Sequence, residues 1–207
     1  MVIVALHLTT RMYTITLFAS LLISAFVAIA VKKSHESDEC IPCANHQRTF
    51  VMIKPDAVQR ELIGELITRF ERKGLHLVAM KFLKPDEKLV REHYAETKDK
   101  NYFDKLIEYI TSGPVVAMVW EGHQVVHTVR TMIGGQPQWL TPLNSGYSKM
   151  SSMRYASPGT IRGDYVHKGD KNVIHASDSL EAAQREIALW FDPQDLVCWK
   201  AANCDWI

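Results

Sequence analysis

Thr49-Phe50-Val51-Met52-Ile53 is a continuous apolar run that stops at Lys54 and Pro55. A short run without polar alternation predicts a strand that is buried on both faces, as in a sheet covered by helices. Proline ends such a strand because it has no backbone N–H to donate. Lys54 is therefore expected at the carboxyl end of the strand, the edge at which α/β sheets bind ligands.

The same two kinds of pattern recur along the rest of the chain. Apolar residues at helical spacing predict helices over 62–70, 103–110, 125–133 and 180–190, and short apolar runs predict strands over 75–82, 115–120 and 173–175. Strands and helices alternate, which indicates an α/β (α+β) sandwich. Because only four short strands are found, we expect a ferredoxin-like, four-stranded antiparallel sheet covered by helices rather than a doubly wound fold.

Composition and charge exclude several classes of protein. The 207 residues carry 24 Lys+Arg against 23 Asp+Glu, a net charge of +1, so there is no strong basic field for binding nucleic acid. Four cysteines are too few for a disulfide scaffold in a chain that is long enough to bury an adequate core. Bulk charge therefore does not select the partners of this chain.

The first 33 residues are expected to form a hydrophobic anchor or signal segment. Residues 12–31 contain no charged side chain, and as a helix they would span the roughly 30 Å hydrocarbon core of a bilayer. The alternative is a signal peptide cleaved after Ala28-Ile29-Ala30. Lys32 and Lys33 follow the span and Arg11 precedes it, which by a narrow margin favours a cytosolic position for the rest of the chain.

A linker and one main domain follow this segment. Residues 34–47 are polar, mixed in charge and without hydrophobic period, so they read as a linker, and 48–207 form the domain. Cys40 and Cys43 fall in the linker, where we expect two unpaired thiols rather than a redox pair or half of a zinc site. Within the domain, 135–157 lacks periodicity and is interpreted as an irregular insertion.

Three strand ends or turns carry groups suited to chemistry on an anion. Lys54 follows the first strand, and Arg162 lies in a turn-like stretch, where its guanidinium suits a phosphate. His175 leaves a buried strand just before a helix whose amino-terminus is rich in capping side chains, and a neutral imidazole there is a nucleophile beside an anion site. No set of ligands at metal-binding spacing surrounds it, so we expect no protein-bound metal.

Five segments together resemble the nucleoside diphosphate kinase family. They are 48–56 (RTFVMIKPD), 92–94 (EHY), 112–122 (SGPVVAMVWEG), 158–164 (PGTIRGD) and 172–179 (NVIHASDS). The resemblance implies a ferredoxin-like sandwich that assembles as homotrimers or hexamers. It also implies transfer of the γ-phosphate of a nucleoside triphosphate such as ATP to nucleoside diphosphates, in a ping-pong mechanism through a phosphohistidine, with Mg²⁺ on the nucleotide.

The resemblance also implies roles for individual residues. His175 would be the nucleophile, Glu186 would hold its other ring nitrogen, and Ser177 would support the site near that glutamate. The residues implied to bind the nucleotide are Lys54, Tyr94, Tyr102, Arg130, Arg162 and Asn172. Tyr102 would stack on the base, a contact that is indifferent to base identity.

This chain departs from the family pattern at several positions. Ala57 and Ala176 stand where glycine is common, and a positive φ at either would impose strain. Gly169 replaces a small apolar residue that faces the base. The insertion after Gly134 falls in a loop that contacts neighbouring subunits in the family it resembles, which puts oligomerisation in question. The alternative function is therefore a catalytically weak family member that acts as a membrane-associated scaffold.

The apolar segment makes the location of the chain testable. We expect the intact chain to sediment with membranes and to resist carbonate extraction, because residues 12–31 are long and apolar enough to span a bilayer. Protease added to sealed organelles without detergent should digest a cytosol-facing catalytic domain. A soluble product beginning near Val31 would instead establish signal cleavage, and full protection of the uncleaved chain would reverse the orientation.

Overall fold

The computed structural model describes residues 46–134, 156–167 and 171–199, all within one compact unit, Pro42–Ile207. The predictions for residues 1–45, for Gly169 and for most of the insertion lie outside the described residues. In the part of the chain that is described, no helix has the length and apolar character needed to cross a membrane.

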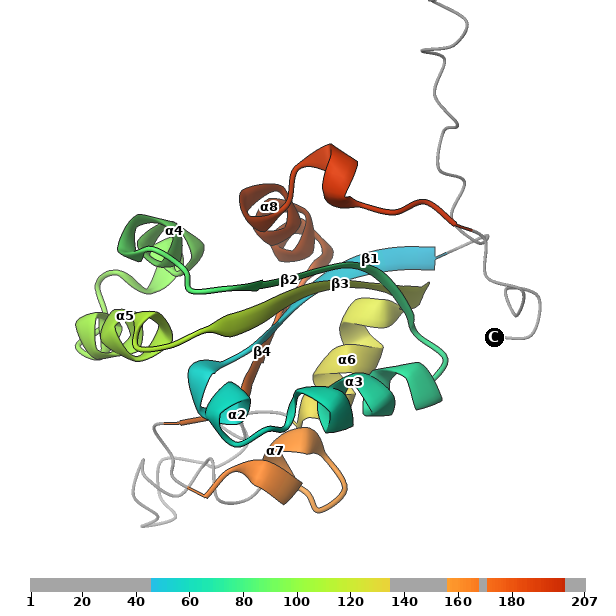
Figure 1. Cartoon of the computed structure of the whole chain (residues 1–207), viewed down its shortest axis with the longest axis horizontal. Helices are drawn as coiled ribbons and strands as arrows, with labels where there is room; N and C mark the ends of the chain where they lie inside the picture. The colour runs from blue at the N-terminus through green and yellow to red at the C-terminus, as the bar shows by residue number, and fades with distance from the viewer. Residues whose placement is uncertain (1–45, 135–155, 168–170, 200–207) are drawn as a thin grey trace, which may run out of the picture. The chain divides into compact units, whose positions relative to one another are not determined.

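Four strands form one antiparallel sheet in the order β2-β3-β1-β4 (Figure 1). The strands are β1 (His46–Ile53), β2 (His76–Leu83), β3 (Val115–His123) and β4 (Ile174–Ala176). This confirms the predicted four-stranded antiparallel sheet. The order places the first strand of the sequence in the interior of the sheet, where it pairs with β3 on one side and with β4 on the other.

Helices cover both faces of the sheet. The helices α2 (Pro55–Gln59), α3 (Ile63–Arg72), α6 (Val125–Ile133) and α7 (Ile161–Tyr165) pack on one face, and α4 (Glu87–His93), α5 (Phe103–Thr111) and α8 (Leu180–Trp190) pack on the other. Figure 1 shows α4 and α8 above the sheet and α3, α6 and α7 below it. Short 3₁₀ turns lie at Ala95–Thr97 and Pro193–Asp195.

The two covered faces explain the unbroken apolar run in β1. Val51 and Ile53 enter the core beneath α3 and α6, whereas Phe50 and Met52 enter the core beneath α5 and α8. All four side chains are fully buried. Because side chains of a strand alternate between faces, a strand with a core on each side must be apolar at every position.

Three short helices were not predicted from the sequence. They are α2, α4 and α7, with 5, 7 and 5 residues, too short to show a helical period. Each nevertheless has a local start signal: Pro55 is the first residue of α2, Asp86 accepts from Leu89 N at the start of α4, and Thr160 accepts from Gly163 N at the start of α7.

Ala57 and Ala176, which stand where glycine is common in the family, show no backbone strain. Ala57 lies inside α2 and Ala176 inside β4, and neither is among the described residues with positive φ. Within the described ranges, the non-glycine residues with positive φ are Glu61, Gln124 and Val173. The methyl groups of the two alanines are thus accommodated in regular backbone and buried.

Replacing Glu61 by glycine should stabilise the fold. Glu61 is exposed with φ of 57°, between α2 and α3, and a left-handed backbone costs a non-glycine residue about 1–2 kcal/mol. For Glu61→Gly we expect a gain of about 1 kcal/mol in the free energy of unfolding and a rise of about 2–4 °C in Tm. Glu108→Gly, at an exposed position inside α5, is the control and should lose about 1 kcal/mol. Equal losses in the two variants would contradict the prediction.

Candidate active site

The backbone turns sharply just before β4. Val173 has φ of 67°, and Ile174 N donates to Asn172 O at 2.7 Å across it, which is a γ-turn. Such a turn is strained, above all for a β-branched residue, and it persists because its surroundings hold it. Val173 is fully buried, and its carbonyl accepts from Lys54 N at 2.9 Å. The turn therefore fixes the end of β1 beside the start of β4.

His175 contacts Glu186 and lies near Ser177. In the register of β1 with β4, His175 is opposite Met52, on the face covered by α8. Its Nε2 lies 3.0 Å from Glu186 Oε2, and Ser177 Oγ donates to the same oxygen at 2.7 Å. Because a carboxylate only accepts hydrogen bonds, Nε2 carries the proton and Nδ1 keeps its lone pair.

Electrostatics keep the His175 ring neutral. Burial, followed by the positive charges of Lys54 and Arg162, holds the pKa of His175 well below its ordinary value of 6.5. Burial also raises the pKa of Glu186 above 4.5, opposed by the hydrogen bond from Ser177. A neutral, oriented imidazole with a free ring nitrogen is the form of histidine that acts as a nucleophile.

Three aromatic rings lie close to the ring of His175. Its ring centroid lies 4.6 Å from that of His93, 5.7 Å from that of Tyr94 and 6.0 Å from that of Phe50. His93 Nδ1 accepts from Trp190 Nε1 at 3.1 Å, and burial lowers the pKa of His93 to about 3. His93 is thus a second neutral imidazole in contact with His175. His93 belongs to the 92–94 motif, but the sequence alone predicts no role for it.

Three cationic side chains converge on the same place from three elements. Lys54 follows β1 and is 4% exposed, and its Nζ donates to Asn172 Oδ1 at 2.5 Å. Arg162, in α7, is 6% exposed and donates to Gly134 O and Ile174 O. Arg130, in α6, donates to Ala176 O at 3.3 Å. All three charges lower the pKa of His175, so together they make a positive site next to its ring.

Burial of Lys54 and Arg162 is costly and lowers the pKa of both groups. The pKa of Lys54 falls to about 7 through burial and through repulsion by Arg162. The pKa of Arg162 falls to about 10 through burial and the nearby charge of Arg130. Like charges that are buried together without an anion are compensated when an anion binds between them.

Several polar atoms at the site lack a hydrogen-bond partner among the described residues. They are His93 Nε2, Tyr94 Oη and Arg162 Nε, all buried. Burial also raises the pKa of Tyr94, so its hydroxyl remains a donor. Buried orphan donors are rare in a folded protein, and at this place they are available to a ligand with acceptor oxygens.

Two features near the site stand apart from this cluster. Tyr102 lies at the start of α5, is 50% exposed and has no described contact with the other predicted site residues. A surface hollow of about 410 Å³ reaches Arg130 and Asp178 but is lined by neither His175 nor Lys54. The structure therefore brings together every predicted site residue except Tyr102.

Comparisons with known proteins agree with this geometry. A family model described as nucleoside diphosphate kinase matches residues 47–196. The chain belongs to the nucleoside diphosphate kinase family. It is 52% identical over 164 residues to nucleoside diphosphate kinase A 1 of Bos taurus, covering 79% of this chain and 98% of the relative, and 43% identical over 193 residues to nucleoside diphosphate kinase 3 of Mus musculus, covering 93% and 96%.

A solved structure shows the same fold with a nucleotide. The nucleoside diphosphate kinase of Halobacterium salinarum in complex with CDP matches with a TM-score of 0.68 and 48% identity, over 77% of this chain and 97% of that one. The predicted family, fold class and enzyme class are thereby confirmed. The chain is a phosphotransferase of the nucleoside diphosphate kinase type.

Nucleotide binding should be coupled to proton uptake at Lys54. The pKa of Lys54 is about 7 in the free protein, and phosphate oxygens should restore it toward 10.5. At a pH between these two values, the Lys54 amine is neutral before the nucleotide binds and protonated afterwards, so binding takes up a proton. At pH 8–9 we expect uptake of up to about one proton per ADP, measured by calorimetry in buffers of different ionisation enthalpy. Lys54→Arg keeps its charge at this pH and should abolish the uptake. Binding of ADP to the parent without proton uptake would contradict this role of Lys54.

Proposed function

We propose that the chain transfers the γ-phosphate of ATP to nucleoside diphosphates through a phosphohistidine on His175. The observation that supports this most directly is the neutral His175 ring, held at Nε2 by Glu186 and bordered by three cations. Nδ1 attacks the γ-phosphorus, an Nδ1–P bond forms, and the bond to the bridging oxygen breaks as the nucleoside diphosphate leaves. A second nucleoside diphosphate then accepts the phosphoryl group by the reverse step.

The residues around His175 supply positioning and charge. Lys54, Arg130 and Arg162 would neutralise the phosphate oxygens, and Asn172 holds Lys54 Nζ in place. Phosphoryl transfer needs alignment and charge stabilisation more than covalent help from other groups. Tyr94 Oη and His93 Nε2, both without partners among the described residues, are suited to hydrogen bonds with the transferring group.

Glu186 and Ser177 act on the ring rather than on the phosphate. The carboxylate accepts from Nε2–H and fixes the tautomer that leaves Nδ1 free. As Nδ1 forms its bond to phosphorus the ring becomes cationic, and the adjacent carboxylate stabilises that charge. Ser177 Oγ anchors the same carboxylate oxygen at 2.7 Å, so the orientation of Glu186 is fixed before the nucleotide arrives.

Mg²⁺ fits this site as an ion carried by the nucleotide. Mg²⁺ prefers oxygen ligands, whereas the side chains that converge here are mostly nitrogen donors and cations. The ligand atoms of His93, His175 and Glu186 lie within 4.8 Å of one another, but Glu186 is already bound to His175 and Ser177. Bound to the phosphates, Mg²⁺ would neutralise their negative charge, and exposed Asp178 is the nearby carboxylate that could face it.

The base is proposed to bind at the rim. Tyr102, half exposed at the start of α5, offers an aromatic face without hydrogen bonds that read the base edge. Stacking on such a ring is worth about 1–3 kcal/mol per base and tolerates any base. We therefore propose a broad range of nucleoside diphosphates as acceptors.

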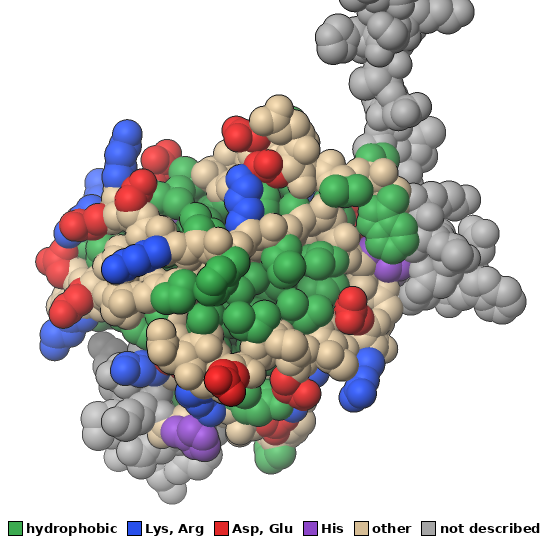
Figure 2. Space-filling view, viewed as in Figure 1, with side chains coloured by type: hydrophobic (Ala, Val, Ile, Leu, Met, Phe, Trp, Pro, Cys, Tyr) green, Lys and Arg blue, Asp and Glu red, His purple; other side chains and the backbone are tan. Residues whose placement is uncertain are grey.

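We also propose that the chain assembles with copies of itself. The edge strand β2 exposes Met80 and Phe82, 52% and 65%, and hydrophobic side chains gather over this part of the surface (Figure 2). Such an apolar edge supports a homo-oligomer, a trimer or hexamer, which sedimentation would detect.

We also propose anchoring through residues 12–31 with the kinase facing the cytosol. Cys198 is disulfide-bonded, and disulfides persist mainly in oxidising compartments, so protease protection of the uncleaved chain is the result that would place the kinase in the lumen instead.

A labelling experiment tests the proposed function. The intact chain with Mg²⁺ and γ-labelled ATP should form an acid-labile, alkali-stable phosphoenzyme. Because its nucleophile is absent, His175→Ala should lose roughly 99% or more of the label. His123→Ala removes an exposed histidine of β3 and should label like the parent. If His175→Ala labels as strongly as the parent, the role of His175 is wrong. An unlabelled parent would favour the scaffold function.

A further inference from the structure

A second cluster of ligand-type side chains lies at the other end of the sheet. It comprises His46 of β1, His76 of β2 and Glu121 of β3, whose ligand atoms all lie within 4.8 Å of one another. In the register of the sheet, Glu121 is opposite Arg48 on one side and His76 on the other. His46 is six residues from Met52, the partner of His175, which places the cluster roughly 20 Å along β1 from the active site.

The cluster is buried, and one of its nitrogens has no hydrogen bond. The side chains of His46 and Glu121 are 4% and 6% exposed, and His76 is 8% exposed. His46 Nδ1 has no hydrogen-bond partner among the described residues. Glu121 Oε1 lies 3.7 Å from it, too far for a hydrogen bond. A buried polar nitrogen without a hydrogen bond needs an explanation, and an ion bound between His46 and Glu121 would supply one.

We propose that His46, His76 and Glu121 bind a divalent transition-metal ion, with Zn²⁺ as the best fit. Two imidazoles and a carboxylate suit Zn²⁺, and imidazole ligands disfavour Mg²⁺ and Ca²⁺. With ligand bonds of about 2.0–2.1 Å, tetrahedral geometry separates ligand atoms by about 3.4 Å. The observed separation of 3.7 Å between His46 Nδ1 and Glu121 Oε1 is close to that edge. Three protein ligands leave a fourth position for water.

Arg48 occupies only one of the two carboxylate oxygens of Glu121. Its Nε donates to Oε2 at 2.8 Å, so Oε1 remains directed toward His46. The guanidinium reduces the negative charge of the site, but it also fixes the carboxylate in the orientation that a monodentate ligand needs. Cys198 is disulfide-bonded and so offers no thiolate to the ion.

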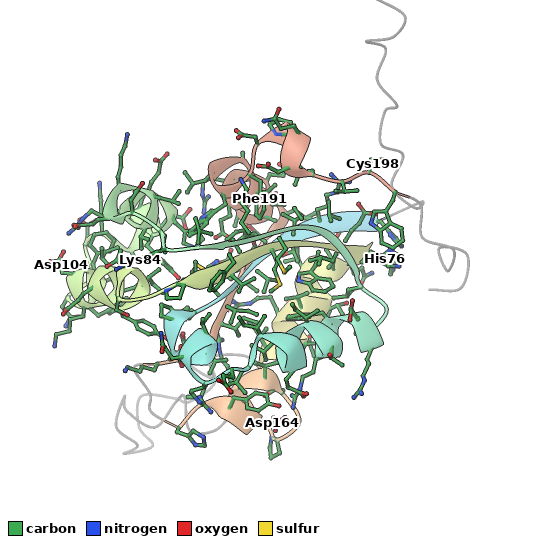
Figure 3. The ribbon with its side chains drawn as sticks, in the orientation of Figure 1. His76, Lys84, Asp104, Asp164, Phe191 and Cys198 are labelled. Carbon is green, nitrogen blue, oxygen red and sulfur yellow. The ribbon has the colours of Figure 1, made fainter. Side chains whose placement is uncertain are left out.

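Trp199 covers the His76 side of the cluster. The centroid of its indole ring is 5.5 Å from that of His76, and its Nε1 donates to Leu77 O at 3.3 Å. His76 lies at the end of the sheet away from α4 and α5 (Figure 3). An ion here would tie the starts of β1 and β2 to the end of β3, and it would bind the folded chain in preference to the unfolded chain.

Zinc titration of paired variants tests the site. The intact chain, stripped of metal with EDTA, is titrated with ZnCl₂ by calorimetry and equilibrium dialysis. We expect His46→Asn/His76→Asn to bind one equivalent fewer than the parent. His123→Asn is the matched control, since exposed His123 is the β3 residue directly opposite His46. It should bind Zn²⁺ like the parent. The comparison of variants subtracts any ion bound at the active site or elsewhere.

Two further readouts separate metal binding from a structural effect of the substitutions. At a Zn²⁺ concentration about 100-fold above Kd, Zn²⁺ should raise the Tm of the parent and of His123→Asn. We expect this rise to exceed that of the double variant by about 5–10 °C. Co²⁺ should give visible d–d absorption that the double variant lacks. Without Zn²⁺, but with the Mg²⁺ that labelling requires, the double variant should retain phosphoenzyme labelling, which shows that it is folded. Equal Zn²⁺ stoichiometry and affinity in parent and double variant would overturn the proposal, as would equal Tm shifts.

Discussion

The antiparallel pairing of β1 with the three residues of β4 is the interaction on which the site depends. Lys54 N donates to Val173 O and Ser177 N donates to Phe50 O, so the hydrogen bonds at both ends of this pairing involve residues next to or within the active site. One strand end contributes Lys54, and the other strand contributes His175 and leads directly to Ser177. The γ-turn at Val173 is the local cost of bringing them together, and a buried valine side chain helps to hold it in place.

The electrostatics of the site follow from an excess of positive over negative charge among the described residues around His175. Lys54 and Arg162 are buried close to each other, and Arg130 adds a third positive charge, while the carboxylate at the centre, Glu186, is bound to His175 and Ser177. Burial and the neighbouring positive charge lower the pKa values of Lys54 and Arg162. In the proposed function the phosphates of a nucleotide supply the missing negative charge, so nucleotide binding and the neutral state of His175 depend on the same three cations.

The parts that could be predicted from the sequence are those with a local signal. The apolar runs in β1 and β3 and the periodic faces of α3, α5, α6 and α8 identify the fold, because each element buries its own side chains on a fixed face. The start of α8 just after β4 also marks His175 as a candidate. The short helices α2, α4 and α7 carry only capping residues, and these are too common to identify a helix.

Residues that are brought together by tertiary contacts could not be predicted from local sequence patterns. Glu186 was assigned through the family resemblance alone, because its position eleven residues after His175 predicts no contact until α8 folds back on the sheet. His93 reaches His175 from α4 by packing against Trp190. His46, His76 and Glu121 come from three strands, and only the register of the sheet brings them together.

The position of β4 at the edge of the sheet has a consequence for solubility. Residues 174 and 176 direct their carbonyls away from β1, toward the open side where another chain could add a strand. Arg162 donates to Ile174 O and Arg130 donates to Ala176 O, so both outward carbonyls are already occupied. The two arginines that we propose to bind the phosphates thus also protect this edge against aggregation. Mutations that remove their charge would expose a short, apolar strand as a template for β-sheet association.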